Sequence, residues 1–236
     1  MSWRKQAKKR ASKEAVKHVK DGFILGLGSG STVAYAIQEI GKRIKQEGLN
    51  VSGVPTSHQA FALAIHNEIP TTTLDEHPQL NLAIDGADQI DTKLNLIKGM
   101  GGALTREKIV ASAAKQFIIV ADETKLTTKL GTKHAVPVEV LPFAASTITL
   151  EVEKMGGKAV LRESNGKIGP VVTENGNFIL DVNFGPINNP KELDCQLKSI
   201  PGILETGLFI NMADITYVGT QTTVQRLERT TRKSLT

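Results

Sequence analysis

The sequence predicts an α/β fold: a parallel sheet with helices on both faces, into which a smaller α+β domain is inserted. Three observations lead to this prediction. Short apolar runs alternate with amphipathic segments as far as Ala121, the pattern changes to shorter runs near Gly131, and a buried-strand pattern returns at Ile215–Val218. Strands that alternate with helices of about ten residues are typical of parallel sheets with right-handed crossovers.

The first predicted element is a helix over residues 1–20. Ala7, Ala11, Ala15 and Val19 recur on one stripe, with lysines around the rest of the wheel. This pattern predicts an amphipathic helix that packs its small residues on the domain, with a basic arm for nucleic acid as the alternative.

The next elements form a strand, a glycine turn and a helix. Phe23–Leu27 is a short apolar run, Gly28–Thr32 is rich in Gly and Ser, and apolar residues then recur at helical spacing from Val33 to Ile44. The alternation continues with a strand at 51–54, a helix at 57–66, a strand at 80–84, a helix at 104–115 and a strand at 117–121.

The segment from 131 to 206 predicts a small α+β domain, with a ferredoxin-like fold as one form that it can take. Its expected strands are 135–140, 158–161 and 178–182, and its expected helices are 144–155 and 190–198. We therefore expect residues 1–130 and 207–236 to form a Rossmann-like catalytic domain around it. The basic tail from Arg226 to Thr236 is expected to be frayed surface.

Composition excludes several classes of function. The net charge is +5, but residues 1–20 alone hold eight Lys or Arg against one Glu, so the rest of the chain is not basic. Aromatic residues, which stack on bases, are only 4%. A nucleic-acid partner is therefore not expected. No apolar run approaches the length of a membrane span, and no signal peptide is expected. The single cysteine, Cys195, cannot form an internal disulfide and leaves no Cys cluster for zinc, which favours the reducing cytoplasm.

Gly28-Ser29-Gly30-Ser31-Thr32 is the first segment that points to chemistry. A glycine turn between a strand and a helix presents backbone N–H groups and the positive end of the helix dipole, which together bind anions. The segment lacks the Gly-Lys-Ser/Thr ending of a P-loop and the last glycine of the dinucleotide fingerprint. We expect phosphate or polyol binding here; a purely structural turn is the alternative.

Asp85-Gly86-Ala87-Asp88 directly follows the apolar Leu82-Ala83-Ile84. Carboxylates at the end of a buried strand are expected to face the cleft in which α/β proteins bind ligands. A helix cap or a turn is the alternative, because Asp favours both.

Two further segments follow. Lys98-Gly99-Met100-Gly101-Gly102 combines a cation with a backbone that can approach a ligand closely. Thr105 is expected to cap the next helix, which would place Glu107 in its first turn, where a solvated Glu is the ordinary alternative. Together the four segments hold three carboxylates, a lysine and two glycine loops, without metal-ligand spacing, and they suit proton transfer next to a carbonyl with an anion held nearby.

The blocks GLGSGSTV, DGAD, KGMGGALTREK and ADETK, in this order and spacing, resemble the A-type ribose-5-phosphate isomerases over essentially the whole chain. The resemblance implies interconversion of ribose 5-phosphate and ribulose 5-phosphate without metal or organic cofactor, by a homodimer or homotetramer. It also implies that Glu107 is the general base, that Asp85 and Asp88 are paired acids, and that Lys98 is the active-site lysine. The substrate-binding residues that it implies are Ser29, Gly30, Ser31, Thr32, Asp85, Gly86, Ala87, Asp88, Lys98, Gly99, Met100, Gly101, Lys125 and Lys8.

The same resemblance implies a mechanism. Asp85 would move the proton that opens the sugar ring, Glu107 would carry a proton from C2 to C1 through a cis-enediolate, and Lys98 would stabilise the oxyanion. Met100 is a departure, because the family often has a third glycine there. Three rivals stay open at this point: another enzyme on the same fold, such as a sugar-phosphate deaminase or an acyl-CoA transferase relative; a sugar-phosphate sensor; and a nucleic-acid binder. The candidate blocks contain no His, and His58 and His66 are expected on a helix at the surface or in the core.

Overall fold

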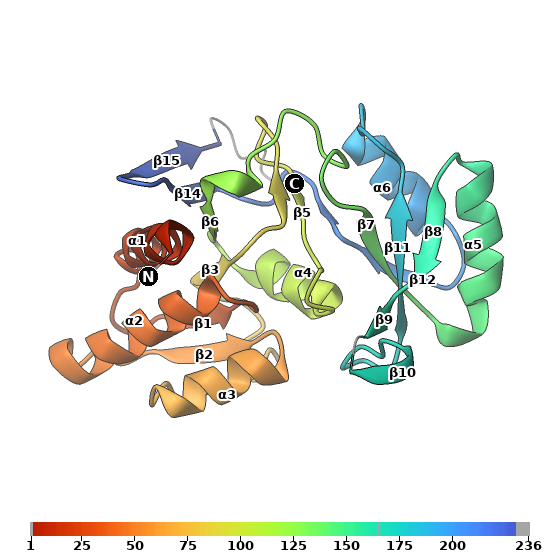
Figure 1. The fold of residues 1–236 in the computed structure, drawn as a ribbon. Coiled ribbons are helices and arrows are strands. Elements are labelled where there is room, and N and C mark those ends of the chain that lie inside the picture. The colour runs from red at the N-terminus through yellow and green to blue at the C-terminus, as the bar shows by residue number, and fades with distance from the viewer. Residues whose placement is uncertain (1, 165, 230–236) are drawn as a thin grey trace. The chain divides into compact units, whose positions relative to one another are not determined.

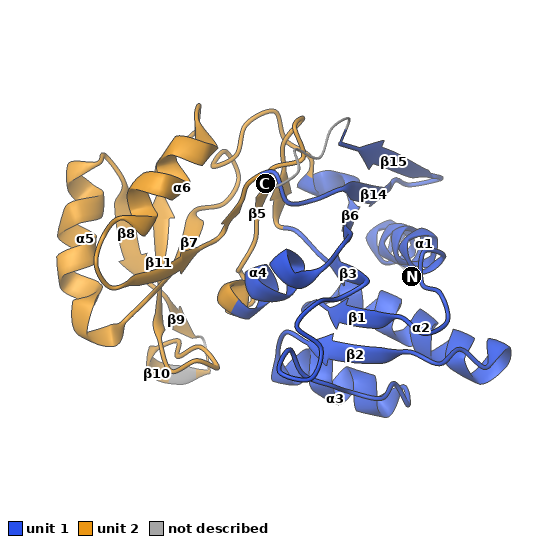
Figure 2. Ribbon diagram, turned by 180° about the vertical axis from the view of Figure 1, so that it is seen from behind, with its two compact units in different colours: residues 1–87, 106–125, 211–236 blue, residues 88–105, 126–210 orange. Residues whose placement is uncertain are grey.

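A computed structural model describes residues 2–164 and 166–229, and the chain divides into two compact units. Unit 1 comprises residues 1–87, 106–125 and 211–236, and unit 2 comprises residues 88–105 and 126–210 (Figure 2). Each unit is built around its own main sheet.

Unit 1 contains a six-stranded sheet in the order β15-β14-β6-β3-β1-β2 (Figure 1). Its first five strands along the chain run parallel, and the last, β15, is antiparallel to its neighbour β14. The strands are β1 (Ile24–Leu27), β2 (Ser52–Pro55), β3 (Leu82–Asp85), β6 (Phe117–Asp122), β14 (Ile215–Gly219) and β15 (Val224–Glu228). The predicted parallel sheet is confirmed.

The start of the C-terminal tail corrects one expectation. Arg226 was expected to begin frayed surface, yet it lies in β15 and pairs with Tyr217 of β14. The charged side chains of Arg226 and Glu228 did not signal a strand, although edge strands often carry charges. Residues 230–236 of that tail lie outside the described residues.

Helices cover both faces of the unit 1 sheet. On one face, Leu25 and Leu27 belong to a core cluster with residues of α1 (Trp3–Val16), α2 (Val33–Glu47) and α3 (His58–His66). On the other face lies α4 (Leu104–Ala113), so close that a Cβ on Gly26 would come within 2.5 Å of Val110 Cγ1. The predicted stripe of the N-terminal segment is confirmed for Ala7, Ala11 and Ala15, which are buried on α1. Val19 is also buried, but it lies beyond Val16, where the helix ends short of the expected residue 20.

The larger part of unit 2 has the predicted ferredoxin-like topology. Two helices and four strands follow each other as βαββαβ, and the antiparallel sheet has the order β12-β7-β11-β8. The elements are β7 (Val136–Val140), α5 (Ala145–Lys154), β8 (Lys158–Leu161), β11 (Phe178–Asn183), α6 (Pro190–Lys198) and β12 (Ile203–Thr206). A two-stranded pair, β9 (Glu163–Ser164) and β10 (Lys167–Pro170), is inserted between β8 and β11.

A second, smaller sheet explains why unit 2 has other bounds than the domain expected at 131–206. Its three strands have the order β13-β5-β4 and are β4 (Gln89–Ile90), β5 (Leu96–Ile97) and β13 (Leu208–Phe209). Because β5 pairs with β13, the segment 88–105 groups with unit 2.

Two short 3₁₀ helices, η1 (Glu123–Lys125) and η2 (Pro142–Ala144), complete the elements of the described residues. Throughout residues 2–164 and 166–229, no helix combines the length and the apolar character needed to cross a bilayer.

Candidate active site

The carboxyl ends of four parallel strands bring candidate residues of unit 1 to one edge of its sheet. The loop 28–32 follows β1, Thr56 follows β2, Asp85 ends β3, and η1 with Lys125 follows β6. This edge is where open α/β sheets bind their ligands.

The loop from Gly28 to Thr32 is held by hydrogen bonds from both sides. The Ser29 hydroxyl lies 2.8 Å from Thr56 Oγ1 and 2.5 Å from Ser57 Oγ, and the Gly30 N–H donates to Gln59 Oε1 over 2.9 Å. The loop then leads into α2 at Val33. Its hydroxyls and amides therefore surround the N-terminus of a helix, as an anion site requires.

Asp85 is the last residue of β3 and is only 2% exposed. Its Oδ1 accepts hydrogen bonds from the N–H of Ser29 at 3.2 Å and from the N–H of Gly86 at 2.7 Å. A Cβ on Gly28 would lie 2.2 Å from the Asp85 carboxylate, so only glycine fits at that point of the loop. Gly86 and Ala87, the next two residues, end this segment of unit 1.

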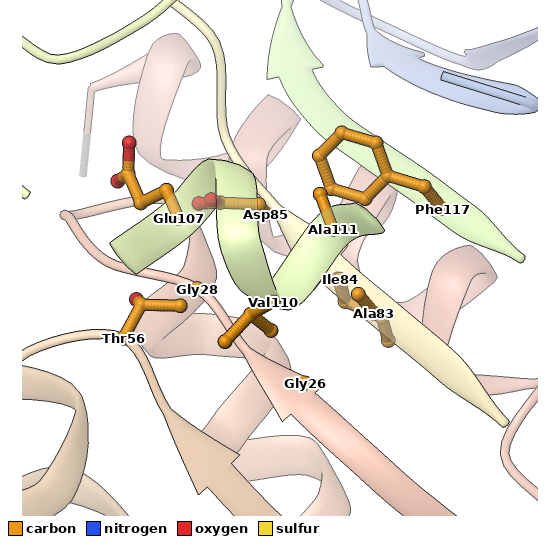
Figure 3. Close-up of a pocket in the computed structure, with 10 residues that line it drawn as sticks. All are labelled: Gly26, Gly28, Thr56, Ala83, Ile84, Asp85, Glu107, Val110, Ala111 and Phe117. Carbon is orange, nitrogen blue, oxygen red and sulfur yellow. The ribbon is translucent and has the colours of Figure 1, made fainter. Parts of the chain in front are cut away.

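Glu107 lies in the first turn of α4 and is 6% exposed. It lines the same pocket as Asp85, together with Gly28 and Thr56; the other lining residues are Gly26, Ala83, Ile84, Val110, Ala111 and Phe117. Figure 3 shows Glu107 projecting from α4 and Asp85 from β3 at one end of this pocket, with Phe117 at the other end. Two buried carboxylates thus share a pocket with the glycine loop.

Two lysines of unit 1 complete this group. Lys8 on α1 donates from Nζ to Ser31 Oγ over 3.0 Å, which joins the N-terminal helix to the loop. Lys125 ends η1, a turn that is fixed because Asp122 Oδ1 accepts from the Thr124 N–H at 3.1 Å. Both lysines are partly buried.

Unit 2 brings together the remaining candidates. The Asp88 N–H donates to the Ile97 carbonyl at 2.8 Å, and Asp88 Oδ2 accepts from the Met100 N–H at 3.2 Å. Lys98 is 3% exposed, and its Nζ lies 5.3 Å from the centroid of the Phe209 ring. The structure therefore places Asp88 beside the glycine-rich segment that Lys98 begins.

The glycines of that segment adopt conformations that other residues avoid. Gly99 has φ +102° and Gly102 has φ +79°. A Cβ on Gly99 would also lie 2.8 Å from the Cβ of Leu104. Between them, Met100 and Gly101 are exposed. The segment is therefore a shaped loop whose path depends on glycine.

Thr105 has a different role from the expected helix cap, and that expectation was wrong. The helix begins one residue earlier, at Leu104, and the Thr105 hydroxyl donates to Glu139 Oε2 at 2.5 Å. Glu139 is completely buried on β7, and its Oε1 accepts from Thr173 Oγ1, Asn175 Nδ2 and Asn177 Nδ2. The Thr105 hydroxyl therefore bonds to the buried Glu139 carboxylate and not to the backbone at the start of α4.

Sequence reasoning missed the loop that follows β2. Thr56 and Ser57 bond to Ser29, and Gln59 bonds to Gly30, so this loop supports the first candidate segment. The rule that ligands bind at the carboxyl ends of parallel strands would have pointed to it.

His58 and His66, expected on a helix at the surface or in the core, lie on α3 and are exposed. Neither lines the pocket that holds Asp85 and Glu107.

The group in unit 1 can exchange protons with a bound molecule, since it combines two buried carboxylates with hydroxyl and amide donors. Within residues 2–164 and 166–229 no three His, Cys, Asp or Glu side chains are arranged to hold a metal ion.

Comparisons with known proteins assign the family. Residues 52–223 match the sequence model described as ribose 5-phosphate isomerase A (phosphoriboisomerase A). Ribose-5-phosphate isomerase A of Methanosarcina acetivorans is 51% identical over 212 residues, which cover 90% of this chain and 89% of that protein.

Two solved structures agree with this match over nearly their full length. Ribose 5-phosphate isomerase A from Methanocaldococcus jannaschii is 47% identical, with a TM-score of 0.91 over 94% of this chain and 98% of that one. A D-ribose-5-phosphate isomerase in complex with phospho-erythronic acid is 46% identical, with a TM-score of 0.94 over 97% of this chain and 100% of that one. On these findings, the chain belongs to the ribose 5-phosphate isomerase A family.

Proposed function

We propose that this protein interconverts ribose 5-phosphate and ribulose 5-phosphate through a cis-enediolate. The observation that carries the proposal is the pocket of unit 1, in which buried Glu107 and Asp85 lie beside the loop that begins at Gly28. Membership of the family supports the choice of reaction. The relative bound to phospho-erythronic acid, a four-carbon sugar-acid phosphate, supports a pentose phosphate as the ligand.

The substrate is held by the loop Ser29–Thr32 and by Lys8. Hydroxyls of Ser31 and Thr32 and the N-terminus of α2 offer donors to a polar or anionic group. Lys8 supports this assignment, because its ammonium group already lies within hydrogen-bonding distance of Ser31. The positive charge of Lys8 and the positive end of the α2 helix dipole both favour binding of an anion here.

The reaction begins with opening of the sugar ring. Asp85 moves the proton between the C1 hydroxyl and the ring oxygen, which gives the open aldehyde. Glu107 then removes the proton from C2 while the electrons of that C–H bond form the C1–C2 double bond and the carbonyl oxygen becomes an oxyanion. Glu107 returns the proton to C1 while the hydroxyl proton of the C2 oxygen moves to the C1 oxyanion with the help of Asp88. The C2 carbonyl then forms, and the ketose leaves. No atom or electron is gained or lost.

Further residues stabilise the charged intermediate, move its hydroxyl protons or contact the substrate. Lys98 and the N–H groups of Gly99 and Gly101 stabilise the enediolate oxygens, a role that preorganised donors perform well in a buried site, while the Met100 N–H donates to Asp88. Asp88 moves or orients the hydroxyl protons. Lys125 contacts the substrate, with Gly86 and Ala87 supplying backbone.

This chemistry needs neither a metal nor an organic cofactor, because a carboxylate base and fixed donors are enough for an enediolate. We further propose that the protein acts in the non-oxidative pentose phosphate pathway, in the cytoplasm, as a homodimer or homotetramer, with neither nucleic acid nor membrane as a partner. The free Cys195 fits a reducing compartment. Light scattering after size-exclusion chromatography gives the number of subunits.

The decisive experiment measures conversion of ribose 5-phosphate to ribulose 5-phosphate in EDTA for the wild type and for Glu107→Gln. A well-placed general base contributes a factor of about 10²–10⁴ in rate, so kcat is expected to fall by at least about a hundredfold. Glu153→Gln, an exposed helical position on α5, is the matched control and should keep wild-type kcat. Wild-type kcat in Glu107→Gln would rule out Glu107 as the base, and absence of wild-type turnover would rule out the reaction.

A further inference from the structure

Arg162 is an almost buried arginine that none of the motifs above contains. It follows β8 directly, and its side chain is 11% exposed. Its Nε donates to Asp181 Oδ2 at 2.8 Å, and its Nη2 pairs with Oδ1 of the same carboxylate. This two-point pairing fixes the plane of the guanidinium group.

The backbone of Arg162 is equally constrained. Its N–H donates to the Ile179 carbonyl and its carbonyl accepts from the Val171 N–H, each at 2.8 Å. Its partner Asp181 lies in the middle of β11, paired with Val160 of β8. Arg162 is therefore fixed at two places: its backbone by hydrogen bonds to Ile179 and Val171, and its guanidinium group by Asp181.

The remaining donor of this arginine reaches the glycine loop. Nη1 donates to the carbonyl of Gly99 at 2.8 Å and to the carbonyl of Met100 at 3.2 Å. These are consecutive carbonyls, so one fixed cation sets the orientation of two successive peptide groups. The Sδ atom of Met100 also lies 4.0 Å from Nη2.

The orientation of these peptide groups determines where their N–H groups point. No peptide bond in the described residues is cis, and in a trans peptide the N–H points away from the carbonyl of the same unit. The N–H groups of Met100 and Gly101 are therefore directed away from Arg162. The first donates to Asp88 Oδ2, whereas that of exposed Gly101 donates to no group of the described chain.

The charge of Arg162 also changes the strength of these donors. A cation that accepts the electron density of a carbonyl oxygen polarises the peptide group and makes its N–H a better donor. The contact of Arg162 with the Met100 carbonyl thus both orients the Gly101 N–H and makes it a stronger hydrogen-bond donor. It is suited to bind an oxyanion of a ligand.

We propose that Arg162 is a positioning residue of the isomerase, which holds the peptide groups of Gly99 and Met100 so that the Gly101 N–H binds the oxyanion of the enediolate. The inference rests on the proposed function. A purely structural role would be to join β8 to β11 through Asp181. The two roles differ in kcat, because only the positioning role acts on the transition state.

Arg162→Lys tests this difference. Lysine keeps a positive charge near Asp181 but lacks the planar fork that reaches two carbonyls at once. We expect kcat to fall by about tenfold to a hundredfold, since small misplacements of a site cost this much, with a much smaller change in KM.

Arg43→Lys is the matched control. Arg43 pairs with Glu47 and donates from Nη1 to the carbonyls of Val16 and Val19, at 2.8 and 3.0 Å, so it has the same chemistry away from the candidate residues. This variant is expected to keep wild-type kcat, although its melting temperature falls.

A second measurement, by NMR, observes the Gly101 N–H directly and does not depend on a variant of Arg162. Protein labelled with ¹³C at methionine carbonyls and ¹⁵N at glycine gives signals only from Met-Gly pairs, which are Met100-Gly101 and Met155-Gly156. Met155→Leu removes the second signal and so assigns both. We expect phospho-erythronic acid to shift the Gly101 signal downfield and to leave Gly156, whose N–H donates to Glu153, unchanged.

The outcomes separate the inference from the proposed function. If the wild type isomerises ribose 5-phosphate but Arg162→Lys keeps its kcat, the inference is overturned and the function stands. If phospho-erythronic acid leaves the Gly101 signal of active wild type unshifted, the inference is also overturned, even if Arg162→Lys does not fold. If the wild type shows no turnover, the proposed function fails and the inference fails with it.

Discussion

Replacing Gly28 with alanine adds a methyl group at the point where the loop approaches strand β3 most closely. The new Cβ would lie 2.2 Å from Cγ and Oδ1 of Asp85 and 2.6 Å from its Cβ. Rotation of the Asp85 side chain cannot relieve the last contact, because the Cβ position is set by the backbone of β3. The adjacent strands β1 and β3 must therefore move apart, or the loop must shift.

The size of the effect follows from this geometry. Gly28 does not have a positive φ, so the cost of alanine is steric rather than conformational. Overpacking of this kind lowers the free energy of unfolding by about 1–3 kcal/mol. A shift of about 1 Å at Asp85 also weakens its bonds from Ser29 and Gly86 and is expected to lower kcat by about a hundredfold.

The assay measures kcat for ribose 5-phosphate and the free energy of unfolding in urea, for Gly28→Ala beside Gly166→Ala. A Cβ on Gly166 meets no atom within 4 Å, so this control should behave as wild type. If Gly28→Ala folds with wild-type stability and keeps kcat within about threefold, the close approach of Gly28 to Asp85 does not govern the site. The reasoning that a displacement of about 1 Å at Asp85 slows the reaction would then be refuted.

Three other predictions concern stability, pH and binding. Glu139→Ala leaves at least two buried donors without their carboxylate, at about 1–3 kcal/mol each, so urea titration should show a loss of about 2–6 kcal/mol; a loss below about 1 kcal/mol contradicts this. The pKa of His18, which bonds to Tyr217, is lowered first by burial and then by the charge of a nearby arginine. The unfolded state therefore binds more protons than the folded state as the pH falls below 6.5, and the free energy of unfolding should fall with it. In His18→Gln the free energy of unfolding should depend less on pH in this range. An unchanged slope would refute the link between the His18 pKa and stability. Lys8→Met should raise the KM for ribose 5-phosphate by about tenfold with kcat nearly constant, since Lys8 reaches Ser31 of the substrate loop; an unchanged KM would exclude a role in binding.

Much of the fold could be predicted because its main strands are buried and apolar. Leu82, Ala83 and Ile84 of β3 and the first five residues of β6 are buried, so these stretches are continuous apolar runs. The candidate residues follow such runs directly, which made Asp85 visible. The pairing of β4, β5 and β13 was not predictable, because strands of two residues carry no periodicity.

Long-range side-chain contacts were likewise invisible in the sequence. Arg162 is 63 residues from Gly99, and no local pattern marks an arginine that bonds to a distant carbonyl. Thr105 is 34 residues from Glu139, and a buried carboxylate overrode the local preference of threonine for a helix cap. In both cases the tertiary structure supplied the partner.

The packing of α1 on β14 has a consequence for the order in which the chain can fold. A Cβ on Gly219 would lie 2.1 Å from the carbonyl oxygen of Ala7, so the backbone of the N-terminal helix rests on the end of β14. Helix α1 can therefore pack in its final position only after residue 219, more than 200 residues further along the chain, has been synthesised. Unit 1 therefore completes its core only after β14 has been made, whereas every strand of unit 2 has been made by residue 209.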